Sequence, residues 1–600
     1  MSDRATVVLA LSAAAGALAS RPLPLGIALA LVAAALAVRR PLVLCLGVAL
    51  ATSALGARAW AGLHPPAAGP WSGTATLVDD PERVSGALRV VVRIGGKRVE
   101  AWARGRAARA VDPRLAGERL ELAGRLQEVP PGLRRRLAPR HVAARLSVER
   151  VGDWAPGDPV SRLANGLRRT LSAGTASLPD DRRALFAGFV LGDDRQQSAE
   201  ITDDFRASGL AHLLVVSGQN VAFVLALVAP VLGRLGLRSR FAVGLAVLVL
   251  FGFLTRWEPS VLRAEAMAAL TLLATTIGRP ASSLRVLALA VSGLLLVDPL
   301  LVRSVGFLLS VGACVGIALL AAPLTRALPG PRPLAGALAV TLAAQAGVVP
   351  VLVPVFGRVP VATVPANLLA APAAGPLTAW AMTVGLPAGV VGGAVAAALH
   401  LPTGLLLAWV ATVARVAASA PLGRLGALHM AALGAGLLAT RLLRRDRGWA
   451  VAAAGAAVAV LAAVPALAPG PVDGTEVAPG ARLWRRGGAA VLVVDGTRSA
   501  VTLLEGLHDA HVRQLDVVVV ARPGPGAAAA VQPLRRRVPI RLVLVPAGTD
   551  DADATVPEPD TSFAVGGLAI HVEAVRPRLR VAVGRAEASA PPAAPRSPPR

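Results

Sequence analysis

The sequence predicts a polytopic α-helical membrane protein that carries two polar domains, one in each half of the chain. Hydrophobic residues make up 54% of the 600 residues, and the mean hydropathy is +0.60, a larger apolar share than soluble domains usually have. Leu, Val and Ala also occur in long blocks, and about 20 mostly apolar residues are enough for a helix to cross a bilayer. Two polar stretches separate or follow these blocks, which predicts the additional domains.

Residues 1–60 are expected to form N-terminal transmembrane helices. Prolines and arginines separate three apolar segments, near 5–19, 23–38 and 41–60. The stretch Met1–Ala19 is short and runs directly into another apolar block. We therefore interpret it as a first membrane helix rather than a cleavable signal peptide.

Residues 61–157 are expected to form a β domain outside the cytoplasm. Apolar and polar residues alternate there, as they do in half-buried strands, and Gly95-Gly96 between two such runs predicts a hairpin. The alternating runs lie at 87–94, 98–104, 118–126 and 142–151. About five short strands of this kind fit a small OB-like β-barrel.

Residues 158–208 are expected to be an amphipathic linker region, with a helix over Arg162–Leu178, and 209–468 a transmembrane channel core. Several core segments contain Pro and Gly, which are tolerated at membrane depth where protein or water covers the freed backbone groups. Pro and Gly are also common in ordinary membrane helices, so this pattern alone does not establish a transport path. The apolar segments lie near 210–233, 240–256, 262–277, 284–302, 305–327, 334–356, 361–385, 386–418, 426–443 and 449–467.

Residues 469–586 are expected to form a small α/β domain, followed by a disordered tail over 587–600. Strands are predicted at 489–495, 515–521 and 541–545, and a helix at 497–511.

The orientation follows from the basic flanks of the membrane segments. The densest flanks are Arg39-Arg40 and the group Arg441, Arg444, Arg445 and Arg447, and such loops stay in the cytoplasm. In each case one membrane segment lies between the basic flank and the soluble domain that follows it. Crossing the membrane once more therefore places both soluble domains on its outer face.

Composition leaves the role of the positive charge open. The net charge is +26, which suits phosphate binding. Lys97 is the only lysine, the chain has no Tyr, and Ala, Gly and Pro are abundant, so coding bias explains the arginine excess equally well. Cys45 and Cys314 both lie in apolar stretches and predict neither a disulfide framework nor a thiolate metal site.

Polar side chains inside the predicted membrane core are the first candidates for a function, because they are costly there. His212, Ser217, Gln219 and Asn220 surround Gly218 at the start of an apolar segment. They predict either a broken helix lining a pore or a helix cap at the membrane surface. His212 is not expected to bind a metal, since no His or Cys lies near it in the sequence.

Arg263 and Glu265 lie inside one predicted membrane helix. Residues two positions apart do not face each other on a helix, so each needs a partner of its own. The alternative is that they lie near the helix start and reach the interface.

Four ordered motifs then give the chain a family resemblance. Phe189–Arg195 leads into Phe205–Asn220, and the pair resembles the hallmark region of the ComEC family of competence proteins. Three later stretches resemble that family's P-S-x-x-R-A-x-x-M, DP…GFxLS and N-L-L-A-x-P motifs. The matching positions are Gly192, Asp193, Arg195, Gly209, Pro259, Ser260, Asp298, Pro299, Gly306, Phe307 and Ser310.

This resemblance implies a channel that passes single-stranded DNA across the bacterial cytoplasmic membrane during natural transformation. It also implies an external DNA receptor and a cytoplasmic ATP-driven helicase-like partner. A phosphate chain needs hydrogen-bond donors along a water-filled path. The residues expected to line this path are His212, Ser217, Gly218, Gln219, Asn220, Arg263, Glu265 and Asn367. The surrounding helices are expected to contact membrane lipid.

The C-terminal domain departs from the family, in which many members carry a metallo-β-lactamase-like domain with a His-rich metal cluster. The strand at Asp516–Val520 continues into Ala521–Gly526, which holds no His and no carboxylate. His508 and His511 lie in the preceding helix, and we interpret them as a solvated face. The sequence therefore predicts a degenerate domain without metal, cofactor or enzyme activity.

Two other classes of function remain open. One is a membrane nuclease with an intact active site, which the missing ligands disfavour. The other is a transporter of a different polymer or of lipid, because fold alone does not fix function.

Overall fold

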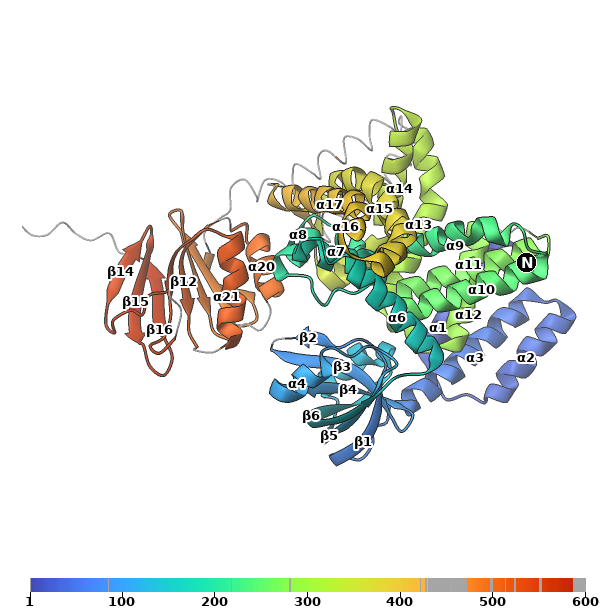
Figure 1. Ribbon diagram of the computed structural model, residues 1–600, viewed down its shortest axis with the longest axis horizontal. Helices are drawn as coiled ribbons and strands as arrows, with labels where there is room; N and C mark the ends of the chain where they lie inside the picture. Colours follow the sequence, from blue (N-terminus) through green and yellow to red (C-terminus); the bar gives the residue numbers. More distant parts are fainter. Residues whose placement is uncertain are drawn as a thin grey trace, which may run out of the picture. The chain divides into compact units, whose positions relative to one another are not determined.

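The computed structural model describes residues 2–84, 86–216, 218–279, 282–420, 422–426, 429, 455, 472–496, 500–512, 514–522, 525–549 and 553–585. The chain divides into two compact units. The core unit comprises residues 1–197, 208–420 and 425–458, and the C-terminal unit comprises 198–207, 421–424 and 459–600. The two units are described separately below, and Figure 1 labels their elements.

Three apolar helices open the core unit: α1 (Asp3–Ala19), α2 (Leu25–Val38) and α3 (Pro41–Gly62). Helices α1 and α3 approach so closely at Gly16 that a Cβ there would overlap the Ala49 carbonyl. Small residues allow such approaches between membrane helices. The three predicted N-terminal segments are therefore helical, with bounds within a few residues of the prediction.

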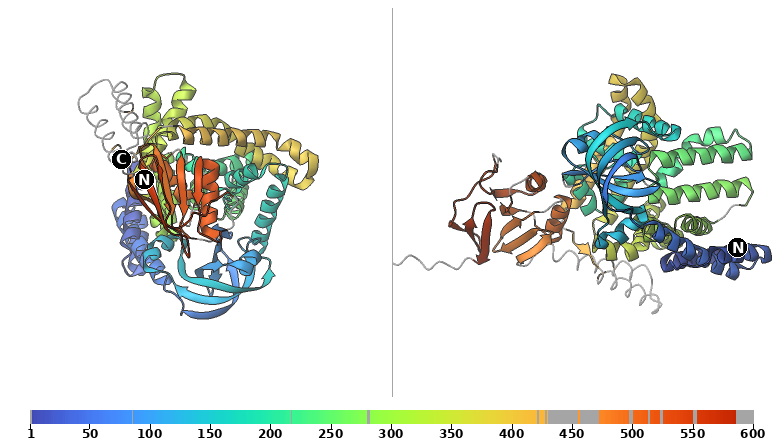
Figure 2. Two further views of the ribbon diagram at one scale, coloured as in Figure 1. Left: turned by 90° about the vertical axis from the view of Figure 1, so that its left-hand side faces the viewer. Right: turned by 90° about the horizontal axis from the view of Figure 1, so that it is seen from below.

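A β domain follows, and its pairing order is cyclic. It is formed by β1 (Gly69–Leu77), β2 (Glu82–Val84), β3 (Ala87–Ile94), β4 (Lys97–Ala103), β5 (Arg119–Glu128) and β6 (Val142–Ala155), with the short helices α4 (Gly105–Val111) and α5 (Pro131–Leu137). Strands pair in the order β1-β5-β6-β4-β3, and β3 pairs with β1 again. Only the β4–β6 pair is parallel among these. The sheet curls strongly, as the blue and cyan strands in Figure 2 show.

The pairing encloses a single apolar interior. Leu77, Val92, Leu120 and Leu146, from four different strands, are at most 2% exposed and belong to one buried cluster. The alternation in each strand, such as eBeBiBeBee along β5, places every second side chain in this cluster. The four predicted strands are all present; β1 and β2 were not individually predicted.

The helices of the remaining core unit form the predicted membrane region. They are α6 (Pro159–Gly174), α7 (Asp180–Leu191), η2 (Ala211–Leu213), α9 (Gly218–Leu232), α10 (Leu237–Leu254), α11 (Pro259–Thr276), α12 (Ser283–Val297), η3 (Pro299–Arg303), α13 (Val305–Ala327), α14 (Arg332–Phe356), α15 (Thr363–Val391), α16 (Gly393–Leu399) and α17 (Leu401–Ser419), with the strands β7 (Val359–Pro360) and β8 (Arg424–Leu425). Among the residues that the structure describes, seven helices are long and apolar enough to cross a membrane. The chain is thus a multi-pass membrane protein.

Two predicted boundaries are wrong. The helix predicted at 162–178 begins earlier, at Pro159, because Asp158 caps it by accepting from the Val160 and Ser161 amides. The segment predicted at 386–418 is not one helix. Helix α15 continues to Val391 and ends at Gly392, whose φ is +68°, before α16 begins. The segments predicted at 426–443 and 449–467, the basic group Arg441–Arg447 and the tail 587–600 lie outside the described residues.

The C-terminal unit has one layer of helices and two sheets. A five-stranded sheet is formed by β9 (Val472–Ala478), β10 (Ala481–Arg486), β11 (Ala489–Val494), β12 (Leu515–Val520) and β13 (Ile540–Leu544), in the order β13-β12-β11-β10-β9. Helices α20 (Ala500–Asp509) and α21 (Pro525–Arg537) share a buried cluster with one face of it, through Leu504 and Leu534. On the other face, Val519 clusters with Ile570 of the sheet β14 (Ser562–Val565), β15 (Leu568–Ala574) and β16 (Arg580–Arg585). The predicted α/β domain is confirmed, with a second sheet that was not predicted.

The C-terminal unit also includes a helix from a distant part of the sequence. Helix α8 (Ala199–Ala207) belongs to this unit and packs against α20 and α21. Asp203 and Phe205 on it are at most 1% exposed. The region predicted as one linker, 158–208, is therefore divided: α6 and α7 belong to the core unit and α8 does not.

Candidate functional site at the convergence of the sequence motifs

The segment 209–220 is a break between helices α8 and α9. It begins at Gly209 (φ +77°), continues as the single 3-10 turn η2, and enters α9 at Gly218. A Cβ at Gly209 would overlap the Thr363 hydroxyl at the start of α15. Only glycine satisfies both the left-handed backbone and this close approach.

The break is connected to α15 and α14 by polar side chains. His212 is hydrogen-bonded to the Asn367 side chain and to the Gly209 backbone. The Asn367 amide in turn donates to Thr341 Oγ1 at 2.8 Å. The structure therefore brings together His212 and Asn367, which lie far apart in the sequence. Ser217 lies outside the described residues.

The far end of the break is fixed to α7. Asn220 Nδ2 donates to the Phe189 carbonyl at 2.7 Å, and Asn220 is buried. Gln219, one residue earlier, is exposed and lies opposite Gly375 of α15, where an added Cβ would be 3.4 Å from its Nε2 atom. Of this pair, Asn220 fixes the start of α9 to α7, and Gln219 is the exposed member.

Arg263 lies directly behind the break. Its Nε atom donates to Ser310 Oγ of α13 at 2.7 Å, and Nη1 lies 3.1 Å from Met267 Sδ. A Cβ at Gly218 would be 2.8 Å from Arg263 Nη2, so the glycine leaves room for the guanidinium. One helical turn earlier, Ser260 donates to the Val216 carbonyl at 3.0 Å. Arg263 is the fifth residue of α11 and is 7% exposed.

Glu265 lies on the same helix but apart from this group. It is 5% exposed, and neither carboxylate oxygen has a hydrogen-bond partner in the described part of the chain. A buried carboxylate without donors is costly. The prediction that each of the two residues has a partner of its own is thus fulfilled for Arg263 only.

The first motif ends helix α7 and fixes its last turn. Gly192, at φ +70°, caps the helix, and the Asp193 carboxylate accepts from Arg195 Nη2 at 2.5 Å and from Arg168 Nη2 at 3.1 Å. Burial alone would raise the pKa of Asp193, and the Arg195 and Arg168 guanidinium groups lower it below its ordinary value.

The DP motif connects the core helices to the β domain. Asp298 caps η3 by accepting from the Leu300 amide at 3.0 Å, and its other oxygen lies 2.9 Å from His141 Nε2 in the β domain. Pro299 and Phe307 are buried. A Cβ at Gly306 would meet open space, and nothing in the structure explains a glycine there.

Sequence reasoning missed a buried ionic hub centred on Asp80. Its carboxylate accepts from Arg168 Nη2 at 2.9 Å and from Arg256 Nη2 at 2.8 Å, and Arg256 also donates to Asn165. Arg168 is 3% exposed. Burial would raise the pKa of Asp80, but the two guanidinium groups outweigh it and hold the pKa at about 2. The only signal in the sequence is an arginine on the buried face of an amphipathic helix.

His508, His511 and the end of strand β12 lie in the C-terminal unit. Among the described residues no group of three or more His, Cys, Asp or Glu side chains could hold a metal ion. After β12, Arg522 pairs with Asp495 at 2.5 Å. His508 lies in the last turn of α20, and His511, at φ +53°, follows that helix. These two histidines are thus close in the chain but begin no cluster of ligands.

Comparison with known proteins identifies the same region. Residues 189–447 match the family model described as "Competence protein". The chain is also 27% identical over 236 residues to ComE operon protein 3 of Bacillus subtilis (strain 168). That alignment covers 39% of this chain and 30% of the relative's length. No solved structure matches the chain.

The matched region contains the break at 209–220, the Arg263 contacts and the Asn367 contacts described above. Residues from different motifs are therefore in contact, as Arg263 is with Ser310 and His212 is with Asn367. Residues 189–447 of this chain are thus similar to the competence protein family, and the chain spans less than a third of the length of the curated relative that it matches.

Proposed function

We propose that this protein is a channel that passes single-stranded DNA across the bacterial cytoplasmic membrane during natural transformation. The observation that carries the proposal is the convergence of the family motifs on the helix break at 209–220. A broken helix exposes backbone groups that must face protein or water. The competence relative supports DNA as the transported polymer.

The chemistry of the break suits a phosphate chain in transit. His212 and Gln219 are exposed side chains at the break, whereas Asn220 and Arg263 are buried. A channel needs donors that attract the polymer without holding it too tightly. In this proposal His212 and Gln219 contact the strand, and Arg263 positions the break and adds a positive potential behind it.

The β domain is proposed to be an OB-like barrel that receives the strand outside the membrane. Its cyclic five-strand pairing with one parallel pair supports this assignment. Trp102 does not offer a free stacking platform, because its indole N–H donates to Glu100 at 3.0 Å and Arg145 lies 5.7 Å above its ring. Stacking on DNA bases at this position would require Arg145 to move.

The C-terminal unit is proposed to be a degenerate metallo-β-lactamase-like domain without nuclease activity. Its two face-to-face sheets, one of which is covered by helices α20 and α21, support this likeness. Degradation of the second strand and the energy for transport then come from other proteins. The expected partners are an external DNA receptor and an ATP-driven helicase-like protein in the cytoplasm.

The test is uptake of labelled duplex DNA in a strain that lacks the gene and carries a variant copy. We expect Arg263→Ala to leave the label outside the cytoplasmic membrane, because helix α11, which packs against the break, loses its hydrogen bond to Ser310 of α13. Arg240→Ala is the matched control, since Arg240 is an exposed arginine on membrane helix α10. Normal entry of DNA in the deletion strain would refute the channel, and a transporter of another polymer or of lipid would replace it.

A further inference from the structure

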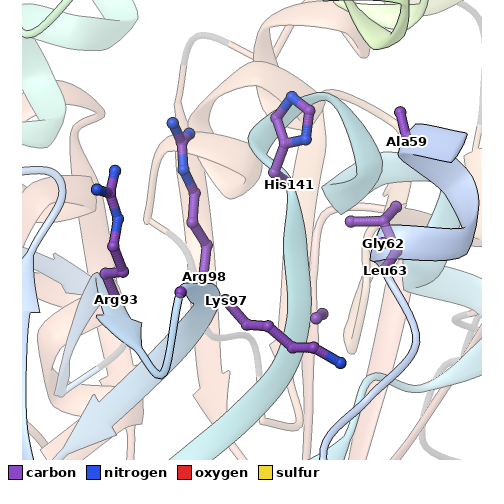
Figure 3. Close-up of a pocket in the computed structure, with 9 residues that line it drawn as sticks. Ala59, Gly62, Leu63, Arg93, Lys97, Arg98 and His141 are labelled. Carbon is purple, nitrogen blue, oxygen red and sulfur yellow. The ribbon is translucent and has the colours of Figure 1, made fainter. Parts of the chain in front are cut away.

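A positively charged pocket lies between the end of α3 and the β3–β4 hairpin, away from the helix break. It encloses about 330 Å³ and is lined by Ala59, Leu63, Arg93, Lys97, Arg98 and His141, among other residues. Figure 3 shows the Arg93 and Arg98 side chains projecting to the same side of the hairpin. No lining residue is acidic. The volume lies within the range of small-molecule sites.

The two arginines form an unfavourable pair in the structure as it stands. Arg93 and Arg98 are directly opposite each other in the antiparallel register, where like charges destabilise a sheet. Arg93 has no acidic partner among the described residues, and the contact found for Arg98 is a 3.4 Å hydrogen bond to the Arg140 carbonyl. Burial, followed by the neighbouring Arg93, lowers the pKa of Arg98. An anion between the two guanidinium groups would relieve the repulsion.

The other polar groups of the pocket keep donors available. Lys97 Nζ donates to the His64 carbonyl at 2.7 Å, which leaves two of its three protons. The carboxyl end of α3 contributes about half a negative charge, and three full positive charges outweigh it. The pocket therefore selects an anion.

The position of the pocket indicates the source of that anion. Helix α3 is a candidate membrane span that ends at Gly62, and Trp60 in its last turn carries Arg303 5.5 Å above its ring. Tryptophan marks the membrane–water interface. A pocket at the end of such a span is expected at the depth of lipid headgroups, and it has apolar residues on its helix side and cations on its hairpin side.

We propose that this pocket binds the phosphodiester headgroup of an anionic phospholipid and holds the β domain against the membrane surface. Arg93 and Arg98 bind the phosphate oxygens from two sides, as guanidinium groups do. Lys97 projects to the other side of the hairpin (Figure 3) and contributes positive charge without contacting the phosphate. A DNA backbone carries the same phosphodiester, but it would have to run within the headgroup layer to reach this position.

The test measures binding of short-chain phosphatidylglycerol to the full-length protein in a neutral detergent, from the shift in melting temperature. We expect Arg93→Gln/Arg98→Gln to bind about tenfold more weakly than the wild type. The control Arg125→Gln/Arg150→Gln removes two exposed arginines of the same domain, and we expect it to bind like the wild type. Short-chain phosphatidylcholine, whose choline meets the cationic lining, should bind weakly to all three proteins.

Equal affinity of the pocket variant and the wild type for phosphatidylglycerol overturns the proposal. So does a result in which single-stranded oligothymidylate binding, and not lipid binding, is lost in the pocket variant, because the pocket then belongs to nucleic acid. Arg93→Gln alone repeats the test at an exposed position if the double variant does not fold. DNA uptake is not used as a readout, so failure here is distinct from failure of the channel.

Discussion

At the scale of single residues, the core unit contains two buried charges with opposite surroundings. Arg263 donates to Ser310, whereas Glu265, two positions along the same helix, has unpartnered oxygens in the described part of the chain. A buried charge is tolerated when hydrogen bonds satisfy it. Arg263 therefore stabilises the break, while Glu265 lowers the stability of the folded protein.

We expect Glu265→Gln to leave the melting temperature of the detergent-solubilised protein unchanged or to raise it. The neutral amide has nearly the same shape and removes the cost of burying a carboxylate. Glu121→Gln on the exposed face of β5 is the control. A clear drop in melting temperature for Glu265→Gln alone would show that the carboxylate is paired in the membrane.

Asp80 presents the opposite case, because two arginines depend on it. We expect Asp80→Asn to destabilise the protein by about 3–5 kcal/mol, since Arg256 would lose its counter-charge and the buried Arg168 would keep only Asp193. Unfolding in denaturant measures the loss, and Asp153→Asn, at an exposed position, should cost almost nothing. Equal stability of the two variants would contradict the hub.

The depressed pKa of Asp80 also sets a pH window. Because the folded pKa, about 2, lies below the unfolded value of about 3.9, the ionised carboxylate stabilises the folded state. This contribution is fully present above about pH 4 and is lost as the pH falls toward 2. Asp80→Asn should lack this acid-dependent loss, which unfolding curves at several pH values would test.

At the scale of elements, the break at 209–220 depends on glycines that serve different purposes. Gly209 combines a positive φ with the close approach of Thr363, and Gly218 leaves room for Arg263. Both positions control how α15 and α11 pack around the break.

We expect Gly209→Ala to destabilise the protein by more than about 1 kcal/mol, the cost of a left-handed backbone, and to abolish uptake. Gly306→Ala is the matched control from the same family motifs, because a Cβ there meets open space and alanine favours a helix. Melting temperatures of both variants check this prediction. A tolerated Gly209→Ala would mean that α15 can move away from the break.

The elements could be predicted from the sequence where a local pattern determines them. Alternation located β3 to β6, and apolar length located the membrane helices. The second sheet of the C-terminal unit was missed because β14 and β16 are short and largely exposed. The Asp80 hub was missed for a different reason. Its members lie at positions 80, 168 and 256, and no local pattern relates residues so distant.

At the scale of the whole molecule, helix α8 links the two units through the chain. Arg537 pairs with both Asp203, at 3.8 Å, and Asp204, and Arg206 pairs with Glu505 at 2.9 Å. Burial raises the pKa of Asp203 to about 7, against the opposing effect of Arg537. The docking of α8 in the C-terminal unit is therefore sensitive to protonation of one carboxyl group.

We expect this docking to weaken as the pH rises from about 4 to 7. The folded pKa of Asp203 lies above the unfolded value, so the folded state binds the proton more tightly and loses stability as the proton dissociates. Hydrogen exchange of the 199–207 peptide should quicken over this range beyond the intrinsic rate. Asp203→Asn should remove the dependence, and Glu558→Gln, at an exposed position, should keep it.

The membership of α8 gives the C-terminal unit a structural role. Phe205 is buried within that unit, and only a few residues later the chain forms the turn at Gly209. A truncation that removes residues 459–600 would therefore uncover Phe205 just before this turn. The C-terminal unit thus supplies the packing for a helix that lies, in sequence, inside the stretch 189–447 that matches the competence family.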